Sequence, residues 1–152
     1  MTGQIVSTPD LGPAFAEGDW AGWSTWTGAE PFEEHAGPYY AKRDSDGRMI
    51  CGCRAQPKNM NGAGVVNGGA LANFADYSLF LIAYDHLRGL GSVTVTLTSE
   101  FLSGAPLGAR ICSRGEVVKA GRSLLFVRGL MDADEVPVLS FSGVIKILRP
   151  RP

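Results

Sequence analysis

Histidine and cysteine are scarce in this sequence, which contains two His and three Cys among 152 residues. Cys51 and Cys53 are separated by one residue, and only His35 and His86 could join them, which makes a poor zinc site. An odd number of cysteines does not indicate a disulfide framework. We therefore expect no bound metal, and we expect Cys51 and Cys53 to lie on one face of a strand as small apolar residues.

The sequence also lacks an excess of positive charge and long apolar runs. The formal net charge of −1 argues against non-specific nucleic-acid binding, which depends on an excess of Lys and Arg. No stretch of about 18 residues is free of charged and turn residues, so no transmembrane helix is expected. Residues 1–13 have no basic residue before an apolar core, so they lack a signal-peptide pattern. We expect a cytoplasmic protein that binds neither nucleic acid nor membrane.

Apolar residues are plentiful, at 45% of the chain, with 19% charged residues, so the sequence can build a core. Its length fits one domain, and no repeat or low-complexity linker divides residues 1–152. Residues 1–35 are predicted to form an irregular N-terminal extension. The spacing of three between Trp20, Trp23 and Trp26 fits one face of a short helix or lid that covers apolar surface elsewhere.

Periodicity in the remaining sequence predicts one long helix and about six strands. The predicted strands are residues 39–43, 49–54, 92–102, 109–119, 123–131 and 136–148. Short breaks between them favour antiparallel neighbours. Residues 70–88 form the predicted helix, about 27 Å long, which is apolar almost all round and therefore buried. A sheet wrapped round this helix would bury it, which gives an α+β fold.

Asp76 is an exception within this apolar helix. It lies nine residues after Asn67, the expected N-cap, which is too far for capping or the helix dipole to explain it. No Lys or Arg lies three or four positions away, so no intrahelical salt bridge is available. Because burying an unpaired carboxylate is costly, Asp76 is expected to meet water and a ligand, or to serve structurally in a solvated gap or against a loop.

Gly68 and Gly69 begin the helix, although each glycine weakens a helix by about 1 kcal/mol relative to Ala. Either a tight loop entry or the close approach of a ligand or backbone explains them. Free N–H groups in a first helical turn can donate to a polarised carbonyl oxygen, and Asp76 could act on water or as a nucleophile. Since no G-x-S-x-G elbow is present, this combination indicates acyl transfer or hydrolysis without a Ser-His-Asp triad.

The run NGAGVVNGGALANFAD, from Asn61 to Asp76, resembles the signature of hotdog-fold thioesterases of the phenylacetate-degradation (PaaI-like) type. In that family an Asn opens a loop, a His-Gly-Gly triplet starts the central helix, and an Asp follows nine residues after the His. Asn61, Gly68, Gly69 and Asp76 lie at matching positions. Asn67 replaces the family His; it can cap a helix but cannot exchange a proton near neutral pH.

The resemblance covers roughly residues 49–148 and includes the strand at 92–97, the turn at 101–108 and the hairpin at 117–123. It implies a hotdog fold, in which an antiparallel sheet of about six strands wraps round one central helix. It also implies an acyl-CoA thioesterase without a cofactor, CoA being part of the substrate. The implied assembly is a homodimer or homotetramer with active sites between subunits.

The resemblance further implies roles for individual residues. Asp76 would be the general base or nucleophile, the Gly68 N–H would polarise the thioester carbonyl, and Asn61 would orient water or substrate. Thr94 matches a strand Ser/Thr position that helps to place water. However, if Val93, Val95 and Leu97 face the helix, Thr94 faces away from it, and only a dimer contact could return it to the site.

The candidate residues for binding CoA are Gly69 and Arg122, with Arg149 and Arg151 as further phosphate partners. Arginine suits this role because its guanidinium donates two hydrogen bonds to a phosphate.

Three other functions stay open. A non-catalytic acyl-CoA-binding hotdog domain is favoured only by Asn67. A hotdog hydratase would need a suitably placed His, whereas His35 lies in a predicted loop and His86 near a helix end. A purely structural oligomer leaves Asp76 unexplained.

Overall fold

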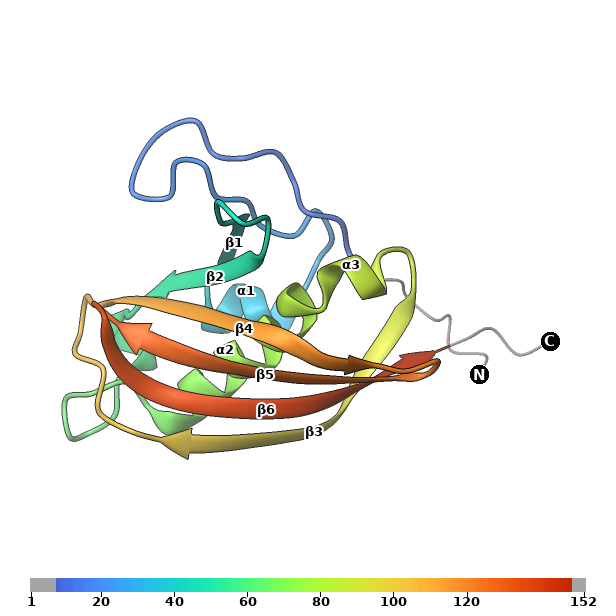
Figure 1. Ribbon diagram of the computed structural model, residues 1–152. Helices are drawn as coiled ribbons and strands as arrows, with labels where there is room; N and C mark the ends of the chain where they lie inside the picture. The colour runs from blue at the N-terminus through green and yellow to red at the C-terminus, as the bar shows by residue number, and fades with distance from the viewer. Residues whose placement is uncertain (1–7, 149–152) are drawn as a thin grey trace.

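The computed structural model describes residues 8–148 as one curved sheet round a central helix (Figure 1). The strands are β1 (Tyr40–Arg43), β2 (Met49–Arg54), β3 (Gly91–Phe101), β4 (Arg110–Ala120), β5 (Leu124–Ala133) and β6 (Val136–Leu148). The helices are α1 (Pro31–Ala36), the short 3-10 helix η1 (Pro57–Asn59), α2 (Gly68–Ile82) and α3 (Tyr84–Leu87). The sheet order is β1-β2-β4-β5-β6-β3, with antiparallel neighbours throughout. The predicted α+β architecture is confirmed.

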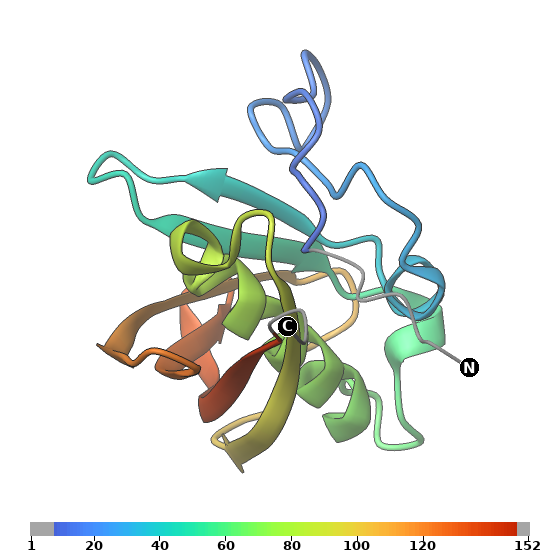
Figure 2. The ribbon, with the colours of Figure 1, turned by 90° about the vertical axis from the view of Figure 1, so that its right-hand side faces the viewer.

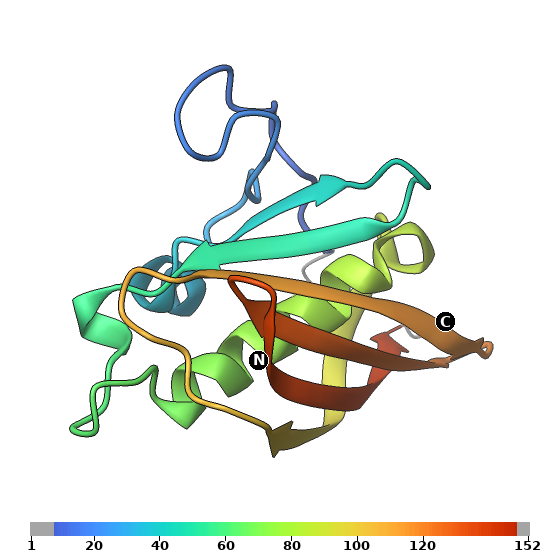
Figure 3. The same ribbon diagram turned by 60° about the vertical axis from the view of Figure 1, so that its left-hand side comes forward.

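Helix α2 lies against the concave face of the sheet, which wraps round it (Figures 2 and 3). Two glycines in the sheet allow this close approach. A Cβ on Gly143 would lie 2.4 Å from Leu79 Cδ1, and one on Gly115 would lie 2.7 Å from Ile82 Cδ1. The buried residues of α2 are Leu71, Phe74, Ala75, Tyr77, Ser78, Leu79 and Leu81. The helix is therefore the centre of the core.

The central helix is shorter than the sequence pattern predicts. The pattern predicts one helix over residues 70–88, but α2 ends at Ile82, and Ala83, with φ −89° and ψ 8°, separates it from α3. Tyr84 and Leu87 of α3 are buried like the residues of α2. Because the apolar pattern continues across Ala83, the break leaves no trace in the hydrophobic periodicity.

The N-terminal extension forms a long loop and the short helix α1, so the expected helix through the three tryptophans is wrong. Trp20 stacks on Tyr40 with ring centroids 4.3 Å apart, and Trp20 and Trp23 lie over Gly52, where a Cβ would meet them at 2.6 and 2.8 Å. Trp26 instead contacts the Tyr77 ring of α2. The tryptophans thus cover apolar surface, as expected, but from a loop.

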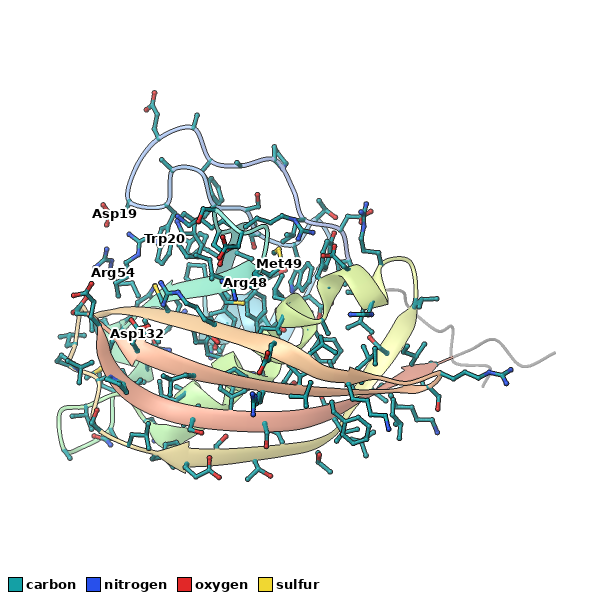
Figure 4. The ribbon with its side chains drawn as sticks, in the orientation of Figure 1. Asp19, Trp20, Arg48, Met49, Arg54 and Asp132 are labelled. Carbon is teal, nitrogen blue, oxygen red and sulfur yellow. The ribbon has the colours of Figure 1, made fainter. Side chains whose placement is uncertain are left out.

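A surface ion pair ties the tip of this loop to the sheet. Asp19 and Arg54 of β2 lie 3.0 Å apart, beside Trp20 (Figure 4). Arg110 of β4 also lies over the Trp20 ring, 4.2 Å from its centroid. The loop is therefore held on the outer face of β2 and β4 by charged as well as aromatic contacts.

Cys51 and Cys53 are both buried, as expected for neighbours on one face of a strand. Within residues 8–148, no group of three or more His, Cys, Asp or Glu side chains is arranged to hold a metal ion. Over the same residues, no helix has the length and apolar character needed to cross a membrane.

Candidate active site

Asp76 lies in the middle of α2, half-buried, on the side that faces β3. Thr94 of β3 donates a hydrogen bond from Oγ1 to Asp76 Oδ1 at 2.6 Å. Asp76 therefore has a hydrogen-bond partner outside its own helix, and that partner comes from the strand that forms one edge of the sheet.

The expectation that Thr94 faces away from the helix is wrong. In the pairing of β3 with β6, Thr94 lies opposite Ile145 and Thr96 lies opposite Val144, so Val95 is an extra residue in a β-bulge. A bulge shifts the alternation of side chains between the two faces. Thr94 thus points inward, while the Val95 side chain is 53% exposed.

A cavity of about 430 Å³ opens beside Asp76 and Thr94, within the roughly 300–1,000 Å³ that small-molecule sites occupy. It is bounded by α2, the start of β3, and the N-terminal loop with α1. The lining residues are Thr8, Pro9, Trp26, Glu30, Glu33, Asp76, Phe80, Ser92, Val93 and Thr94. The N-terminal extension therefore forms one wall of the candidate site.

A larger hollow of about 610 Å³ lies over the outer parts of β4, β5 and β6. Neither Asp76 nor Thr94 lines it, and its arginines are engaged in ion pairs, Arg114 with Asp132 and Arg128 with Glu116. We therefore place the candidate active site at the smaller cavity, where a half-buried carboxylate with a defined hydrogen-bond partner borders a space large enough for a small molecule.

Glu33 of α1 is a second carboxyl group in the wall of this cavity. Trp26 Nε1 donates a hydrogen bond to Glu33 Oε2 at 3.1 Å. Burial raises the pKa of Glu33 to about 7, and repulsion by Glu30 and Asp76 adds to this effect, whereas the hydrogen bond from Trp26 opposes it. Sequence reasoning missed Glu33 because residues 1–35 carry no regular pattern. Only the fold reveals that α1 borders the cavity.

The start of α2 is capped as predicted. Asn67 Oδ1 accepts a hydrogen bond of 2.7 Å from the Gly69 N–H. At Gly68 a Cβ would come within 3.1 Å of the Phe101 ring, so close packing explains the glycine there. Asn61 Oδ1 accepts from the backbone N–H of Ala63 at 2.9 Å and therefore shapes its own loop.

One chain does not bring all the predicted site residues together. Asp76 lies eight positions after Gly68 in α2, a distance of about 12 Å along the helix axis. Neither Gly68 nor Asn61 lines the cavity beside Asp76. A single thioester carbonyl cannot touch both the Gly68 N–H and the Asp76 carboxylate of the same chain.

The remaining candidate residues that the structure describes do not line the cavity beside Asp76. Arg122 is exposed in the turn between β4 and β5, and Arg149 and Arg151 fall outside the described residues. His35 and His86 are both exposed, at the ends of α1 and α3.

A six-stranded antiparallel sheet wrapped round one central helix is the hotdog fold, and here a carboxylate on that helix lies beside a cavity. A family model described as the thioesterase superfamily matches residues 63–139, about half of the chain. The chain belongs to the thioesterase superfamily, and it is a thioester hydrolase by class.

Two relatives are similar in sequence. Human acyl-coenzyme A thioesterase 13 is 28% identical over 100 residues, which are 66% of this chain and 71% of the human protein. A Pseudomonas aeruginosa protein, provisionally named an esterase, is 27% identical over 120 residues, which are 78% of this chain and 90% of that protein. The family match and these relatives agree on ester or thioester chemistry.

Two solved structures illustrate the shared fold. A Bacillus halodurans protein crystallised with CoA has a TM-score of 0.67 and 23% identity, covering 73% of this chain and 74% of that one. An Asn-to-Asp mutant of the phenylacetic acid degradation protein PaaI from Thermus thermophilus has a TM-score of 0.68 and 20% identity, covering 78% and 100%. At these identities the similarity shows the fold alone, and it agrees with the PaaI-like resemblance of the sequence.

Proposed function

We propose that the chain is an acyl-CoA thioesterase, which hydrolyses a thioester to a carboxylic acid and free CoA. The observation that carries this proposal is the hydrogen-bonded pair of Asp76 and Thr94 beside a cavity, in a chain of the thioesterase superfamily. The CoA in the Bacillus halodurans structure and the name of the human relative support CoA thioesters as the substrate class.

Asp76 acts as general base or as nucleophile in this proposal. As a base, its carboxylate takes a proton from water while the water oxygen attacks the thioester carbon; the C–S bond then breaks, and the proton passes to the leaving CoA sulfur. As a nucleophile, the carboxylate attacks that carbon itself and displaces the CoA thiolate, which leaves an anhydride that water hydrolyses to the free acid and Asp76. Thr94, which donates to Oδ1, holds the carboxylate in one orientation. The negative charge that develops on the carbonyl oxygen needs a donor, and the Gly68 N–H at the start of α2 supplies it.

Because Gly68 and Asp76 of one chain lie too far apart, the donor comes from a second copy. Strand β3 forms one edge of the sheet, and eleven-residue edges with exposed apolar side chains are unusual in monomers. Val95 and Phe101 on β3 are 53% and 58% exposed. These features support a homodimer in which the two β3 edges pair antiparallel.

A two-fold axis between Leu97 and Thr98 would bring the two halves of the site together. Thr94 and Phe101 lie equally far from such an axis, so Thr94 of one copy would lie opposite Phe101 of the other. Phe101 packs on Gly68, and Thr94 bonds to Asp76. The part of the site that contains Asp76 in one copy would therefore lie next to the part that contains Gly68 in the other copy. The dimer is the smallest assembly that completes the site, and a tetramer would repeat it.

The alternative is a non-catalytic domain that binds acyl-CoA, which the replacement of the family His by Asn67 favours. Asn67 keeps the structural part of that position, because it caps α2 through a 2.7 Å hydrogen bond. If the His assists chemistry in the family, Asn67 would slow turnover without preventing binding.

The test is hydrolysis of short, medium, long and aromatic acyl-CoAs by the wild type and by Asp76→Asn. We expect turnover by the wild type and a fall of about two to four orders of magnitude in kcat for the variant, because the amide cannot accept the proton. Asp85→Asn serves as the control, since Asp85 forms only an exposed ion pair with Arg43. Bound acyl-CoA without any turnover by the wild type would contradict the proposal and favour the binding domain.

A further inference from the structure

The cavity beside Asp76 carries acidic groups without basic ones. Three of its ten lining residues are carboxylic acids, Glu30, Glu33 and Asp76, and none of the ten is Lys, Arg or His. The remaining lining residues are apolar or carry hydroxyl groups. A bound acyl group would therefore meet negative charge from three sides of the cavity wall: from α2, from α1 and from the loop before α1.

Glu33, like Asp76, is held in the wall by a hydrogen bond. Its carboxyl group accepts a hydrogen bond from the Trp26 indole at 3.1 Å, and the Trp26 ring in turn packs against Tyr77 of α2 with centroids 5.8 Å apart. Glu33, Glu30 and Trp26 also line a second cavity of about 170 Å³ that reaches Tyr39 and Tyr77. Glu33 therefore stands at the border between the space next to Asp76 and the space beyond it.

The titratable groups that act on Glu33 are all acids. They are Glu30 from the preceding loop, Asp76 and the Tyr77 hydroxyl from α2, the Tyr39 hydroxyl ahead of β1, and the Cys51 thiol from β2. Among the described residues, no cation offsets the charge of Glu33 when it ionises. A ligand that brings a further negative charge into this cavity would thus meet repulsion that no basic group relieves.

We propose that Glu33, together with Glu30 and Asp76, makes this enzyme select acyl groups that carry no negative charge and reject acyl-CoAs whose chain ends in a carboxylate. The inference rests on the proposed function and adds the substrate class. The repulsion provides specificity against one class of substrate without improving the binding of the other. The proposal places the acyl group, and not the CoA phosphates, in the acidic cavity, so it concerns the charge of the acyl group alone.

The selection depends on pH because Glu33 changes charge near neutrality. With a pKa of about 7, its carboxyl group is mostly neutral at pH 6 and can donate a hydrogen bond to an incoming carboxylate. At pH 8 it is mostly ionised and repels that carboxylate. Rejection of a carboxylate-ended acyl group should therefore strengthen as the pH rises through 7.

The experiment compares hexanoyl-CoA with adipoyl-CoA, which has the same six-carbon chain ending in a carboxylate. We expect the wild type to favour hexanoyl-CoA in kcat/KM by about tenfold or more at pH 8, and by less at pH 6. Glu33→Gln keeps an oxygen that can accept from Trp26 but has no charge. In this variant the preference should fall several-fold and lose its dependence on pH.

Two further variants make the comparison specific. Glu17→Gln removes an exposed acid of the N-terminal loop and should leave both the preference and its pH dependence unchanged. Glu30→Gln removes the second acid of the wall and should weaken the preference, which tests the idea even if Glu33→Gln folds poorly. Equal kcat/KM for the two substrates in the wild type at pH 8, or an unchanged preference in both wall variants, would overturn the inference.

Calorimetric titration of the wild type with the same two compounds separates this inference from the proposed function. If neither these two compounds nor any acyl-CoA of the wider panel is hydrolysed, the proposed function fails. The ratio of the affinities for hexanoyl-CoA and adipoyl-CoA then still tests whether the cavity rejects a carboxylate-ended acyl group. Tighter binding of hexanoyl-CoA that grows with pH supports the acidic wall, and equal affinities contradict it.

Discussion

The hydrogen bond from Thr94 fixes one oxygen of the Asp76 carboxylate in the candidate site. At 2.6 Å its length lies in the range of charge-assisted hydrogen bonds from a hydroxyl group to a carboxylate. The same bond holds β3 against α2 at the edge of the sheet. A change at Thr94 should therefore affect catalysis through the orientation of Asp76.

Replacing Thr94 by Val removes the hydroxyl group and keeps the shape of the side chain. A hydrogen bond to a charged group contributes about 1.5–3 kcal/mol, so we expect kcat/KM to fall about tenfold to a hundredfold. Thr94→Ser, which restores the donor, should recover most of the loss. Ser45→Ala, which removes an exposed hydroxyl group from the turn between β1 and β2, away from the β3 edge, is the control. Steady-state kinetics on the preferred acyl-CoA would make the comparison, and wild-type activity in Thr94→Val would rule out the positioning role.

The sequence predicts some of these residues and not others, for physical reasons. Asp76 could be predicted because a carboxylate inside an apolar helix is anomalous wherever the fold places it. The orientation of Thr94 could not, because the bulge at Val95 depends on how β3 pairs with β6. Glu33 could not either, because its burial and its contact with Trp26 arise only when α1 packs beside α2.

At the scale of elements, the close contact between α2 and the sheet depends on two glycines in the strands, which have no side chain. Gly143 of β6 lies directly under Leu79, and Gly115 of β4 under Ile82. In a closely packed interior, an added methyl group at such a point forces neighbouring atoms to move. These glycines thus set how closely the sheet curves round the helix.

Gly143→Ala tests this contact. The new Cβ would lie 2.4 Å from Leu79 Cδ1 and 2.8 Å from the Thr96 carbonyl oxygen, and the backbone oxygen cannot move away without disturbing β3. We expect a loss of about 1–3 kcal/mol in the free energy of unfolding, measured by urea denaturation. Gly62→Ala is the control, because a Cβ there would have no atom within 4 Å and the φ of Gly62 is not positive. Equal stability of Gly143→Ala and wild type would show that α2 and β6 do not need to be as close as the contact between Leu79 and Gly143 implies.

Element boundaries differ in how well the sequence predicts them. Strands β2 and β6 begin and end at the predicted residues, since turn residues mark both ends of each. The end of α2 at Ile82 could not be predicted, because the pattern of buried residues in α2 continues past Ala83 to Tyr84 and Leu87. The covering role of the tryptophans followed from their apolar character, but their loop conformation depends on long-range contacts such as that of Trp20 with Tyr40.

At the scale of the whole molecule, the proposed site needs two chains, each of which supplies one half. In a symmetric dimer both sites contain Asp76 from one copy and the Gly68 N–H from the other. A variant that lacks either group therefore loses both sites. A mixed dimer of the two variants, however, has one site with both defects and one site with none.

Complementation between Asp76→Asn and Gly68→Pro tests this arrangement. Proline has no N–H, and the first position of a helix tolerates it, so Gly68→Pro removes the donor. Its Cβ would also come within 3.1 Å of the Phe101 ring, so Gly68→Ala, which adds the same Cβ and keeps the N–H, controls for that contact. Asp76→Asn and Gly68→Pro should each be nearly inactive alone. After subunit exchange at equal concentrations, half of the dimers are mixed, and activity should return to about a quarter of the wild-type value per chain. Mixing Asp76→Asn with Asp76→Asn,Gly68→Pro provides the control that should stay inactive. Folded dimers of both variants that exchange subunits without regaining activity would mean that Gly68 and Asp76 do not meet across the β3 edge, and that the carbonyl oxygen finds its donor elsewhere.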